Sequence, residues 1–305
     1  MKGVQKKSNF SEQYVRAVGI SDVFVKCVAR SEKKYQKLAF IGAGNMARSL
    51  IGGLLNRGYP AEKLACSDPS EACLIAAQKL GPIKTTHSNP DIIADADLVI
   101  LAVKPQVLKN VLQPLTGLLQ QGRPLLVSIA AGINSASLQQ WAGDEVPIVR
   151  CMPNTPALLQ QGASALYATD QVSDAQRRLA ETVLSAVGIV AWVETEPTLD
   201  VVTALSGSGP AYFFLFMEAM QAVAEQLGLD TETAQRLTQQ TALGAARMAI
   251  ESDDDVAELR RKVTSPNGTT EAAIQSFENS QLRETVELAL TAAFLRSQAL
   301  AKELA

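Results

Sequence analysis

The first two thirds of the chain alternates short apolar runs with segments of helical periodicity. Two runs, 97–103 and 124–129, are apolar at almost every position, a pattern typical of strands that are buried on both faces of a sheet. Shorter runs predict three more strands, at 37–41, 63–67 and 147–151. Helices are predicted at 42–57 and 69–80. Strands that alternate with helices indicate an α/β domain, a Rossmann-like doubly wound parallel sheet, over residues 37–197.

The last third of the chain, residues 198–305, has no convincing strand run and is predicted to be all helical. Four helices are expected, at 211–227, 231–250, 270–278 and 282–304. Two stretches, 211–217 and 288–295, are apolar nearly all round the helix. Such helices need more cover than a small domain offers, so we expect a partner subunit. The alternative is that both pack beneath their neighbours.

Residues 1–36 are expected to form a poorly ordered extension. Their apolar run at 23–25 is interrupted by Lys26 and is too short for a secretory signal, and Glu12, Asp22 and Glu32 argue against an import presequence. An upstream start that is not normally used would look the same. A targeting or interaction arm is the alternative.

Composition narrows the functional classes. A length of 305 residues suggests two domains, and a net charge of −3 argues against nucleic acid or anionic membrane as a partner. No apolar run approaches the roughly 20 residues of a membrane span, and the missing export signals suggest a cytoplasmic enzyme. Four cysteines form no C-x-x-C pair and His87 is the single histidine, so no metal site is expected.

The sequence Gly42-Ala-Gly44-Asn-Met-Ala47, here called the glycine turn, follows the first predicted strand and opens a helix. In that context it matches the dinucleotide-binding pattern. Gly42 permits the tight turn, Gly44 lets backbone amides approach a pyrophosphate, and Ala47 keeps the helix close to the strand. The helix N-terminus offers free N–H groups to the anion.

Asp68 follows the second predicted strand, 21 residues beyond Ala47. An acidic residue there would accept a hydrogen bond from a ribose 2′-hydroxyl and favour NADH. Asp68 could equally cap the next helix, and Ser67 with Arg48 could suit a 2′-phosphate. The choice between NADPH and NADH is therefore open.

Two further strands end in segments suited to a cofactor. Lys104 ends the 97–103 run at its carboxyl edge, where ligands of such sheets collect, and would face a cofactor phosphate or solvent. The small residues of 129–133 leave room for a nicotinamide ring or allow close helix packing.

Two Gly- and Ser/Thr-containing loops are predicted in the second half. Residues 205–210 place two glycines before a helix that begins with proline, and residues 263–270, here called the Ser/Thr loop, cluster hydroxyls at a helix start. Backbone amides, hydroxyls and a helix dipole would bind a small carboxylate. Ordinary helix capping is the alternative for each loop.

Five segments together resemble the pyrroline-5-carboxylate reductase family, which completes proline biosynthesis. They are Phe40-Ile-Gly-Ala-Gly-Asn-Met46, Ala-Val-Lys-Pro at 102–105, Arg150-Cys-Met-Pro-Asn-Thr-Pro156, Leu205-Ser-Gly-Ser-Gly-Pro-Ala211 and Val263-Thr-Ser-Pro-Asn-Gly-Thr-Thr270. The last corresponds to the signature loop of the family. The resemblance extends over residues 37–305.

This resemblance implies an NADPH- or NADH-dependent oxidoreductase that reduces 1-pyrroline-5-carboxylate, a cyclic imine, to L-proline. It implies an all-helical dimerisation domain at 198–305 and homodimers, often assembled into larger rings, in which the Ser/Thr loop of one subunit completes the partner's active site. The implied cofactor-binding residues are Gly42, Ala43, Gly44, Asn45, Met46, Ala47, Ser67, Asn89, Ala102, Val103 and Lys104. The implied substrate-binding residues are Ser265, Asn267, Gly268, Thr269 and Thr270, and Thr270 is the catalytic residue that places its hydroxyl near the imine nitrogen.

Hydride addition to an imine needs no histidine, because the proton can arrive from solvent. Two other functions fit the architecture less well. A β-hydroxyacid dehydrogenase would use a lysine on the long helix at 211–227, which has none. A non-enzymatic nucleotide sensor would have no need of the Ser/Thr loop.

Overall fold

The computed structural model describes residues 35–304, so the expectation for residues 1–36 lies almost entirely outside the described residues. The described residues form two compact units: 35–213 with 284–304, here called the sheet unit, and 214–283, here called the helical unit. The predicted division after residue 197 stays a prediction.

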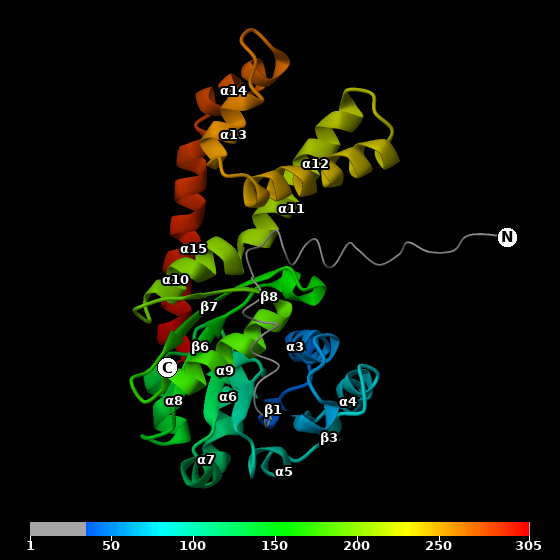
Figure 1. Ribbon diagram of the computed structural model, residues 1–305. Coiled ribbons are helices and arrows are strands. Elements are labelled where there is room, and N and C mark those ends of the chain that lie inside the picture. The colour runs from blue at the N-terminus through cyan, green and yellow to red at the C-terminus, as the bar shows by residue number, and fades with distance from the viewer. Residues whose placement is uncertain (1–34, 305) are drawn as a thin grey trace, which may run out of the picture. The chain divides into compact units, whose positions relative to one another are not determined.

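The sheet unit contains eight strands in the order β3-β2-β1-β4-β5-β6-β7-β8 (Figure 1). Their bounds are β1 Leu38–Ile41, β2 Leu64–Ser67, β3 Lys84–Thr86, β4 Leu98–Leu101, β5 Leu125–Ser128, β6 Ile148–Met152, β7 Gly162–Ala168 and β8 Gly188–Trp192. The five predicted strands are confirmed. The other three, β3, β7 and β8, were not predicted, although β8 contains an apolar run, 189–193, as long as the run that predicted β1.

The predicted parallel sheet is confirmed from β3 to β6, but β7 pairs with β6 in the antiparallel direction. Only residues 153–161 join these two strands, which is shorter than the roughly twelve residues that a parallel crossover needs. The helix α9 (Asp174–Leu184) lies in the longer connection to β8, which is parallel to β7.

Alternate residues of each central strand enter different cores. In β1, Leu38 and Phe40 belong to one hydrophobic cluster, while Ala39 and Ile41 belong to the other. The first cluster is completed by α3 (Asn45–Asn56), α4 (Glu71–Gln78) and α9. The second is completed by α5 (Pro90–Ile93), α6 (Pro105–Leu112), α7 (Thr116–Gly122) and α8 (Ser135–Ala142). Helices therefore cover both faces, as a doubly wound sheet requires.

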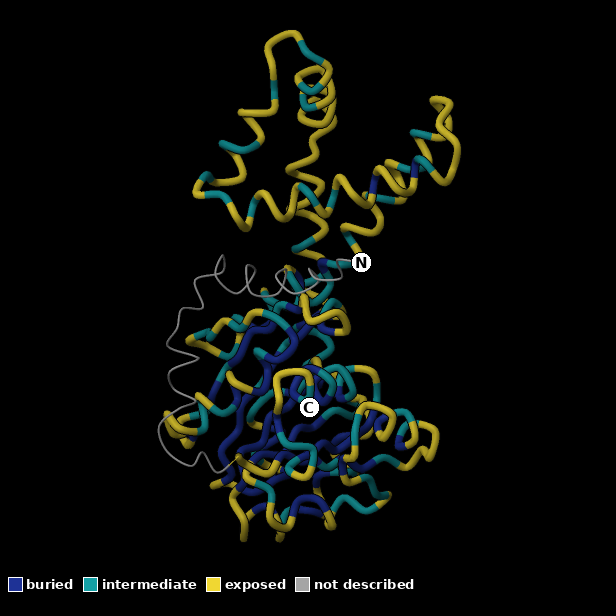
Figure 2. The backbone as a smooth tube through the Cα atoms, turned by 45° about the vertical axis from the view of Figure 1, so that its right-hand side comes forward, coloured by how far each residue is buried: buried dark blue, intermediate teal, exposed yellow. Residues whose placement is uncertain are grey.

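The four predicted C-terminal helices are confirmed as α11 (Gly209–Gln226), α12 (Thr231–Glu251), α14 (Thr269–Asn279) and α15 (Leu282–Leu304). The short helices α10 (Thr198–Val202) and α13 (Val256–Lys262) were not predicted. Within the helical unit only Ala234 and Thr238 are buried, and most of its backbone is coloured as exposed in Figure 2.

The loop predicted at 205–210 is wrong, because a π-helical turn, Thr203–Gly207, joins α10 to α11. The result is one continuous helix, Thr198–Gln226. An 18-residue window of it has a mean hydropathy of 1.2, which by length and composition alone would suffice to cross a membrane, and 17% of this window is buried. This helix contains Asp200, Glu218 and Glu225, so the expectation that no uninterrupted apolar run approaches the length of a membrane span is not contradicted.

Two neighbouring glycines in α3 provide a test of its packing. A Cβ atom on Gly53 would lie 2.5 Å from the carbonyl oxygen of Ala186, whereas one on Gly52 would meet nothing closer than Leu80 Cδ2 at 3.9 Å. We expect Gly53→Ala to lower the free energy of unfolding by about 1–3 kcal/mol. Gly52→Ala should raise it by about 0.5–1 kcal/mol, because alanine stabilises helix interiors. Urea unfolding measures both, and equal effects of the two variants would contradict the packing.

Candidate active site

The glycine turn lies at the carboxyl end of β1, between β2 and β4. Gly42 has φ +99°, and a Cβ atom there would lie 2.6 Å from the carbonyl oxygen of Ala102, at the end of β4. Only glycine therefore permits both this backbone conformation and this approach. A Cβ atom on Gly44 would meet nothing within 4 Å, so the space above the turn is open.

The helix α3 begins directly after this open space. Gly44 is its N-cap, and no side chain caps the helix. The first helical hydrogen bond runs from Arg48 N–H to the Gly44 carbonyl at 3.0 Å, so the amides of Asn45, Met46 and Ala47 have no acceptor within the helix. Such a site fits the pyrophosphate of a dinucleotide.

Asp68 binds the glycine turn directly. Its Oδ2 atom accepts a hydrogen bond from Ala43 N–H at 2.8 Å, and its Oδ1 atom accepts one from Ser70 N–H at 2.8 Å. The carboxylate thus joins the turn to the entry of α4, a role that sequence reasoning did not foresee. His87 lies beside Asp68 and forms two hydrogen bonds: its Nδ1 atom is 2.8 Å from the Asp68 carbonyl oxygen and its Nε2 atom is 3.0 Å from Oε2 of Glu71.

The structure brings two other predicted cofactor residues together. The fully buried Ser67 donates a hydrogen bond from Oγ to Oδ1 of Asn89 at 2.6 Å. Lys104 is exposed and is the N-cap of α6 at the carboxyl end of β4. Arg48 binds the Ala43 carbonyl and the Asn45 side chain, so it supports the glycine turn from the helix side.

A partly buried ionic cluster holds the segment after β5, and the sequence analysis missed it. Glu196 accepts hydrogen bonds from the backbone and hydroxyl of Ser135, both at 2.6 Å, and from Arg150 at 2.8 Å. Ser135 is the first residue of α8 and lies two residues after the 129–133 segment, which could leave room for the nicotinamide ring. The cluster therefore fixes the end of that segment.

The Ser/Thr loop forms a tight turn in the helical unit. Gly268 N–H donates to the Ser265 carbonyl at 3.0 Å, Asn267 has φ +58°, and its N–H donates to Oε2 of Glu271 at 2.7 Å. Gly268 is the N-cap of α14, which no side chain caps. The capping alternative therefore describes only part of this loop: Thr264 binds a carbonyl at the end of α13 and Glu271 binds the Asn267 amide, while the N-cap of α14 has no side-chain cap.

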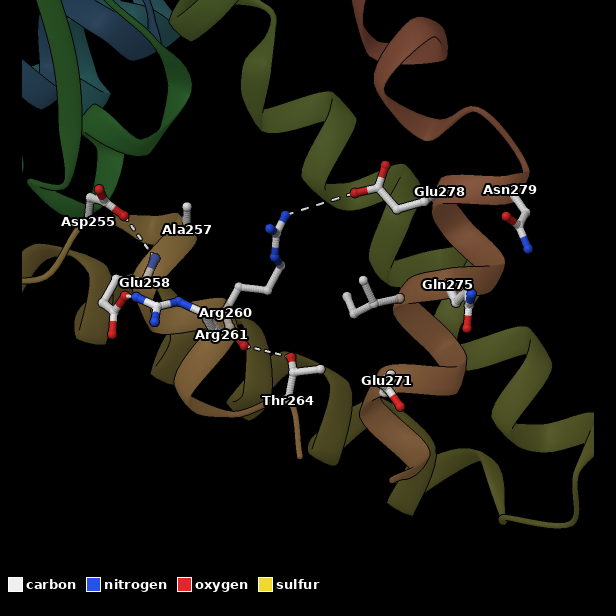
Figure 3. Close-up of a pocket in the computed structure, with 11 residues that line it drawn as sticks. Asp255, Ala257, Glu258, Arg260, Arg261, Thr264, Glu271, Gln275, Glu278 and Asn279 are labelled. Carbon is white, nitrogen blue, oxygen red and sulfur yellow. Dashed lines mark hydrogen bonds and ion pairs between the residues drawn. The ribbon is translucent and has the colours of Figure 1, made fainter. Parts of the chain in front are cut away.

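A groove between α13 and α14 begins beside this loop (Figure 3). Its arginines are already in ion pairs, since Arg260 lies 4.0 Å from Glu278 and Arg261 pairs with Glu258. Thr264 donates its hydroxyl to the Arg260 carbonyl at 2.7 Å. A carboxylate bound at the Ser/Thr loop would therefore depend on amides and hydroxyls rather than on these arginines.

The two buried cysteines of the sheet unit, Cys66 and Cys151, are poor nucleophiles. Burial raises the pKa of the Cys151 thiol to about 12 and that of Cys66 to about 11, with Asp68 adding to the second shift. Both thiols stay protonated at neutral pH, so neither supplies a thiolate. Among the described residues no group of three or more His, Cys, Asp or Glu side chains is arranged to hold a metal ion.

Comparison with known proteins gives consistent matches. A family model for the dimerisation domain of pyrroline-5-carboxylate reductase matches residues 196–300, and a model for F420-dependent NADP oxidoreductases matches residues 37–132. A pyrroline-5-carboxylate reductase from Pseudomonas aeruginosa is 57% identical over 268 residues, 88% of this chain and 98% of that protein. A pyrroline-5-carboxylate reductase from Vibrio alginolyticus is 43% identical over 88% of this chain and 99% of that protein.

Solved structures agree with these matches. A pyrroline-5-carboxylate reductase from Coxiella burnetii superimposes with a TM-score of 0.85 at 45% identity, over 88% of this chain and 99% of that one. The enzyme from Plasmodium falciparum, solved with NADP bound, gives a TM-score of 0.77 at 31% identity, over 87% of this chain and 98% of that one.

The Asp68 hydrogen bonds lead to a kinetic prediction. Asn in place of Asp68 keeps one acceptor for two amides, so Asp68→Asn should loosen the glycine turn and raise KM for NADPH and NADH in parallel, by about 3–10-fold. Steady-state assays with each cofactor measure this. Glu71→Gln removes a nearby charge without touching the turn and should change KM less than about twofold. A loss confined to NADH would instead indicate that Asp68 reads the ribose.

Proposed function

The chain belongs to the pyrroline-5-carboxylate reductase family, and from this premise we propose that the glycine turn binds the cofactor and that the Ser/Thr loop binds the substrate. The function itself follows from the relatives: NAD(P)H-dependent reduction of 1-pyrroline-5-carboxylate to L-proline, the final step of proline biosynthesis. The chain is therefore an oxidoreductase that acts on a cyclic imine.

The observation that carries the assignment of the substrate loop is the uncapped start of α14. A helix N-terminus with free amides and adjacent hydroxyls attracts a carboxylate through its dipole and through hydrogen bonds. The proposed substrate-binding residues are Ser265, Asn267, Gly268, Thr269 and Thr270. Glu271 supports them by binding the Asn267 amide.

The cofactor would lie across the carboxyl edge of the sheet. The residues that would hold it are Gly42, Ala43, Gly44, Asn45, Met46, Ala47, Ser67, Asn89, Ala102, Val103 and Lys104. The open space above Gly44 and the uncapped α3 fit its pyrophosphate. When bound, NAD(P)H supplies the hydride that adds to the imine carbon.

The protein's own contribution is alignment and polarisation. The loop amides and hydroxyls would fix the substrate carboxylate, and the Thr270 hydroxyl would donate a hydrogen bond to the ring nitrogen as the carbon accepts hydride. Positioning of two reactants is worth up to ~7–11 kcal/mol in well-aligned cases. A proton from solvent completes the reaction, so no titrating side chain is required.

We infer that a second copy of the chain covers α11. Phe213, Phe214 and Leu215 in this helix are each more than 60% exposed, and Leu288 in α15 is 65% exposed. Apolar side chains exposed in such numbers are typical of an obligate interface, and the matched dimerisation domain spans both helices. A homodimer that assembles further into a ring would bury them.

The same proposal accounts for the long apolar helix, Thr198–Gln226. A partner subunit that covers α11 makes a bilayer unnecessary, so we propose a cytoplasmic location. We also propose that the functional division falls after residue 197, with a dinucleotide-binding domain at 37–197 and a dimerisation and substrate domain at 198–305.

The proposed role of Thr270 can be tested by loss of reduced-nicotinamide absorbance, with 1-pyrroline-5-carboxylate as the acceptor. The wild-type chain should oxidise NADPH or NADH, and Thr270→Ala should lower kcat well over tenfold, since a lost hydrogen bond to the reacting group costs ~1–3 kcal/mol. The dissociation constant of the cofactor should not change.

Thr270→Ser keeps the hydroxyl and should retain most of the activity. Thr264→Ala removes a hydroxyl that binds the Arg260 carbonyl and should affect stability rather than turnover. Unchanged kinetics in Thr270→Ala would remove Thr270 from the site, and a folded wild-type chain that binds cofactor but reduces no imine would contradict the function.

The proposed dimer can be tested by light scattering after size-exclusion chromatography. The wild-type chain should run at twice its chain mass of 32.5 kDa or above, and Leu215→Glu should shift it toward the monomer, because a buried unpaired charge opposes association. Ile75→Glu places the same charge at an exposed position on α4 and should leave the mass unchanged. A monomeric wild-type chain would contradict the proposal.

A further inference from the structure

The π-helical turn Thr203–Gly207 leaves two backbone carbonyls without their usual helical partners. In an α-helix the Ala204 carbonyl would accept from Ser208 N–H, but that N–H donates to the Thr203 carbonyl at 2.8 Å instead. The Ser206 carbonyl would accept from residue 210, which is proline and has no N–H. Buried carbonyls without partners are costly, so other groups must supply the donors.

Two side chains supply these donors. Asn154 donates from Nδ2 to the Ser206 carbonyl at 3.0 Å, and Tyr212 donates its hydroxyl to the Ala204 carbonyl at 3.1 Å. The Asn154 side chain is buried, and its Oδ1 accepts from Ala163 N–H, at the start of β7, at 2.8 Å. One amide group therefore binds the π-turn to the sheet through both of its polar atoms.

The π-turn also packs on the carboxyl end of a parallel strand. Met152 is the last residue of β6, and a Cβ atom on Gly207 would lie 2.4 Å from Met152 Cε. Because β6 is parallel to β5, this end belongs to the same edge as the glycine turn. Neighbouring strands are about 4.8 Å apart, so β6 lies about 14 Å from β1 along this edge.

That separation identifies which half of the cofactor the π-turn would meet. Asp68 and Ser67 lie on the β2 side of the glycine turn, where the adenosine ribose would bind. The nicotinamide half would then extend in the other direction, over β4 and β5 toward β6. The π-turn lies at the end of that path, and such turns occur frequently at functional sites.

We propose that Asn154 and Tyr212 are positioning residues for the reductase reaction: they hold the π-turn in place as a wall at the nicotinamide end of the cofactor site. This inference rests on the proposed cofactor site. Asn154 lies in the 150–156 segment and Tyr212 in the apolar stretch 211–217, and the sequence predicted no role in the site for either residue. Neither residue is proposed to touch the substrate, and both act through the backbone of 203–207.

Asn154→Asp tests the proposal with a side chain of the same shape. It places a carboxylate oxygen against the Ser206 carbonyl, so the π-turn should shift. We expect kcat with 1-pyrroline-5-carboxylate to fall at least about tenfold. The dissociation constant of NADPH, measured by fluorescence titration, should change less than about twofold, because the pyrophosphate site is untouched. Hydrogen exchange should become faster in the peptide that contains Ser208.

Tyr212→Phe removes only the second donor and should lower kcat by about 3–10-fold. Tyr59→Phe is its matched control, because Tyr59 also donates its hydroxyl to a backbone carbonyl, that of Gln36, at 2.7 Å. Tyr59 lies before β2, at the opposite edge of the sheet. This variant should lose stability without losing turnover.

The outcomes separate this inference from the proposed function. An inactive wild-type chain would overturn the proposed function. An active wild-type chain with wild-type kcat in both Asn154→Asp and Tyr212→Phe would overturn the positioning role alone. If Asn154→Asp does not fold, the test is the comparison of kcat between Tyr212→Phe and its control, Tyr59→Phe. Equal kcat values in these two variants would also overturn the positioning role.

Discussion

The close approach of Gly42 to the Ala102 carbonyl is the contact on which the sheet unit's site depends. A Cβ atom at Gly42 would lie 2.6 Å from that oxygen, so the carboxyl ends of β1 and β4 meet only because the side chain is absent. Parallel pairing of β1 with both β2 and β4 then brings the ends of all three strands to one edge. The Asp68 carboxylate completes this arrangement by holding the Ala43 amide.

Hydride addition to an imine needs no acidic or basic side chain of the protein, because the proton can come from solvent. The candidate sites on the described residues contain few titratable groups. The cofactor supplies the reducing equivalent, and the candidate ligand groups are backbone amides and hydroxyls at two uncapped helix starts, those of α3 and α14. The thiols of Cys66 and Cys151 are kept neutral by burial. In the proposed site, placement of neutral donors would take the part that acid–base side chains have in other enzymes.

The two units differ in how much of their apolar surface is buried within a single chain. The sheet unit buries two hydrophobic clusters, one on each face of its sheet. The helical unit leaves Phe214, Leu215 and many other apolar side chains exposed and buries only Ala234 and Thr238. Burial of apolar surface is the dominant stabilising contribution to folding, and the helical unit buries far less of it within a single chain than the sheet unit does.

Features that depend on a local pattern of residues could be predicted from the amino-acid sequence. Apolar runs predicted β1, β4 and β5, the glycine turn predicted a candidate nucleotide-binding edge, and the Ser/Thr loop predicted the start of α14. The direction of β7, the partners of Asp68 and the π-turn in place of a predicted loop depend on contacts between distant segments. β7 is antiparallel to β6 because the 153–161 connection between them is short. Asp68 binds the Ala43 amide, 25 residues away. Asn154 donates to the Ser206 carbonyl, which lacks its helical donor because residue 210 is proline. The hydrophobic periodicity of a segment predicts which of its side chains are buried. It does not predict which distant polar group will form a hydrogen bond with its backbone.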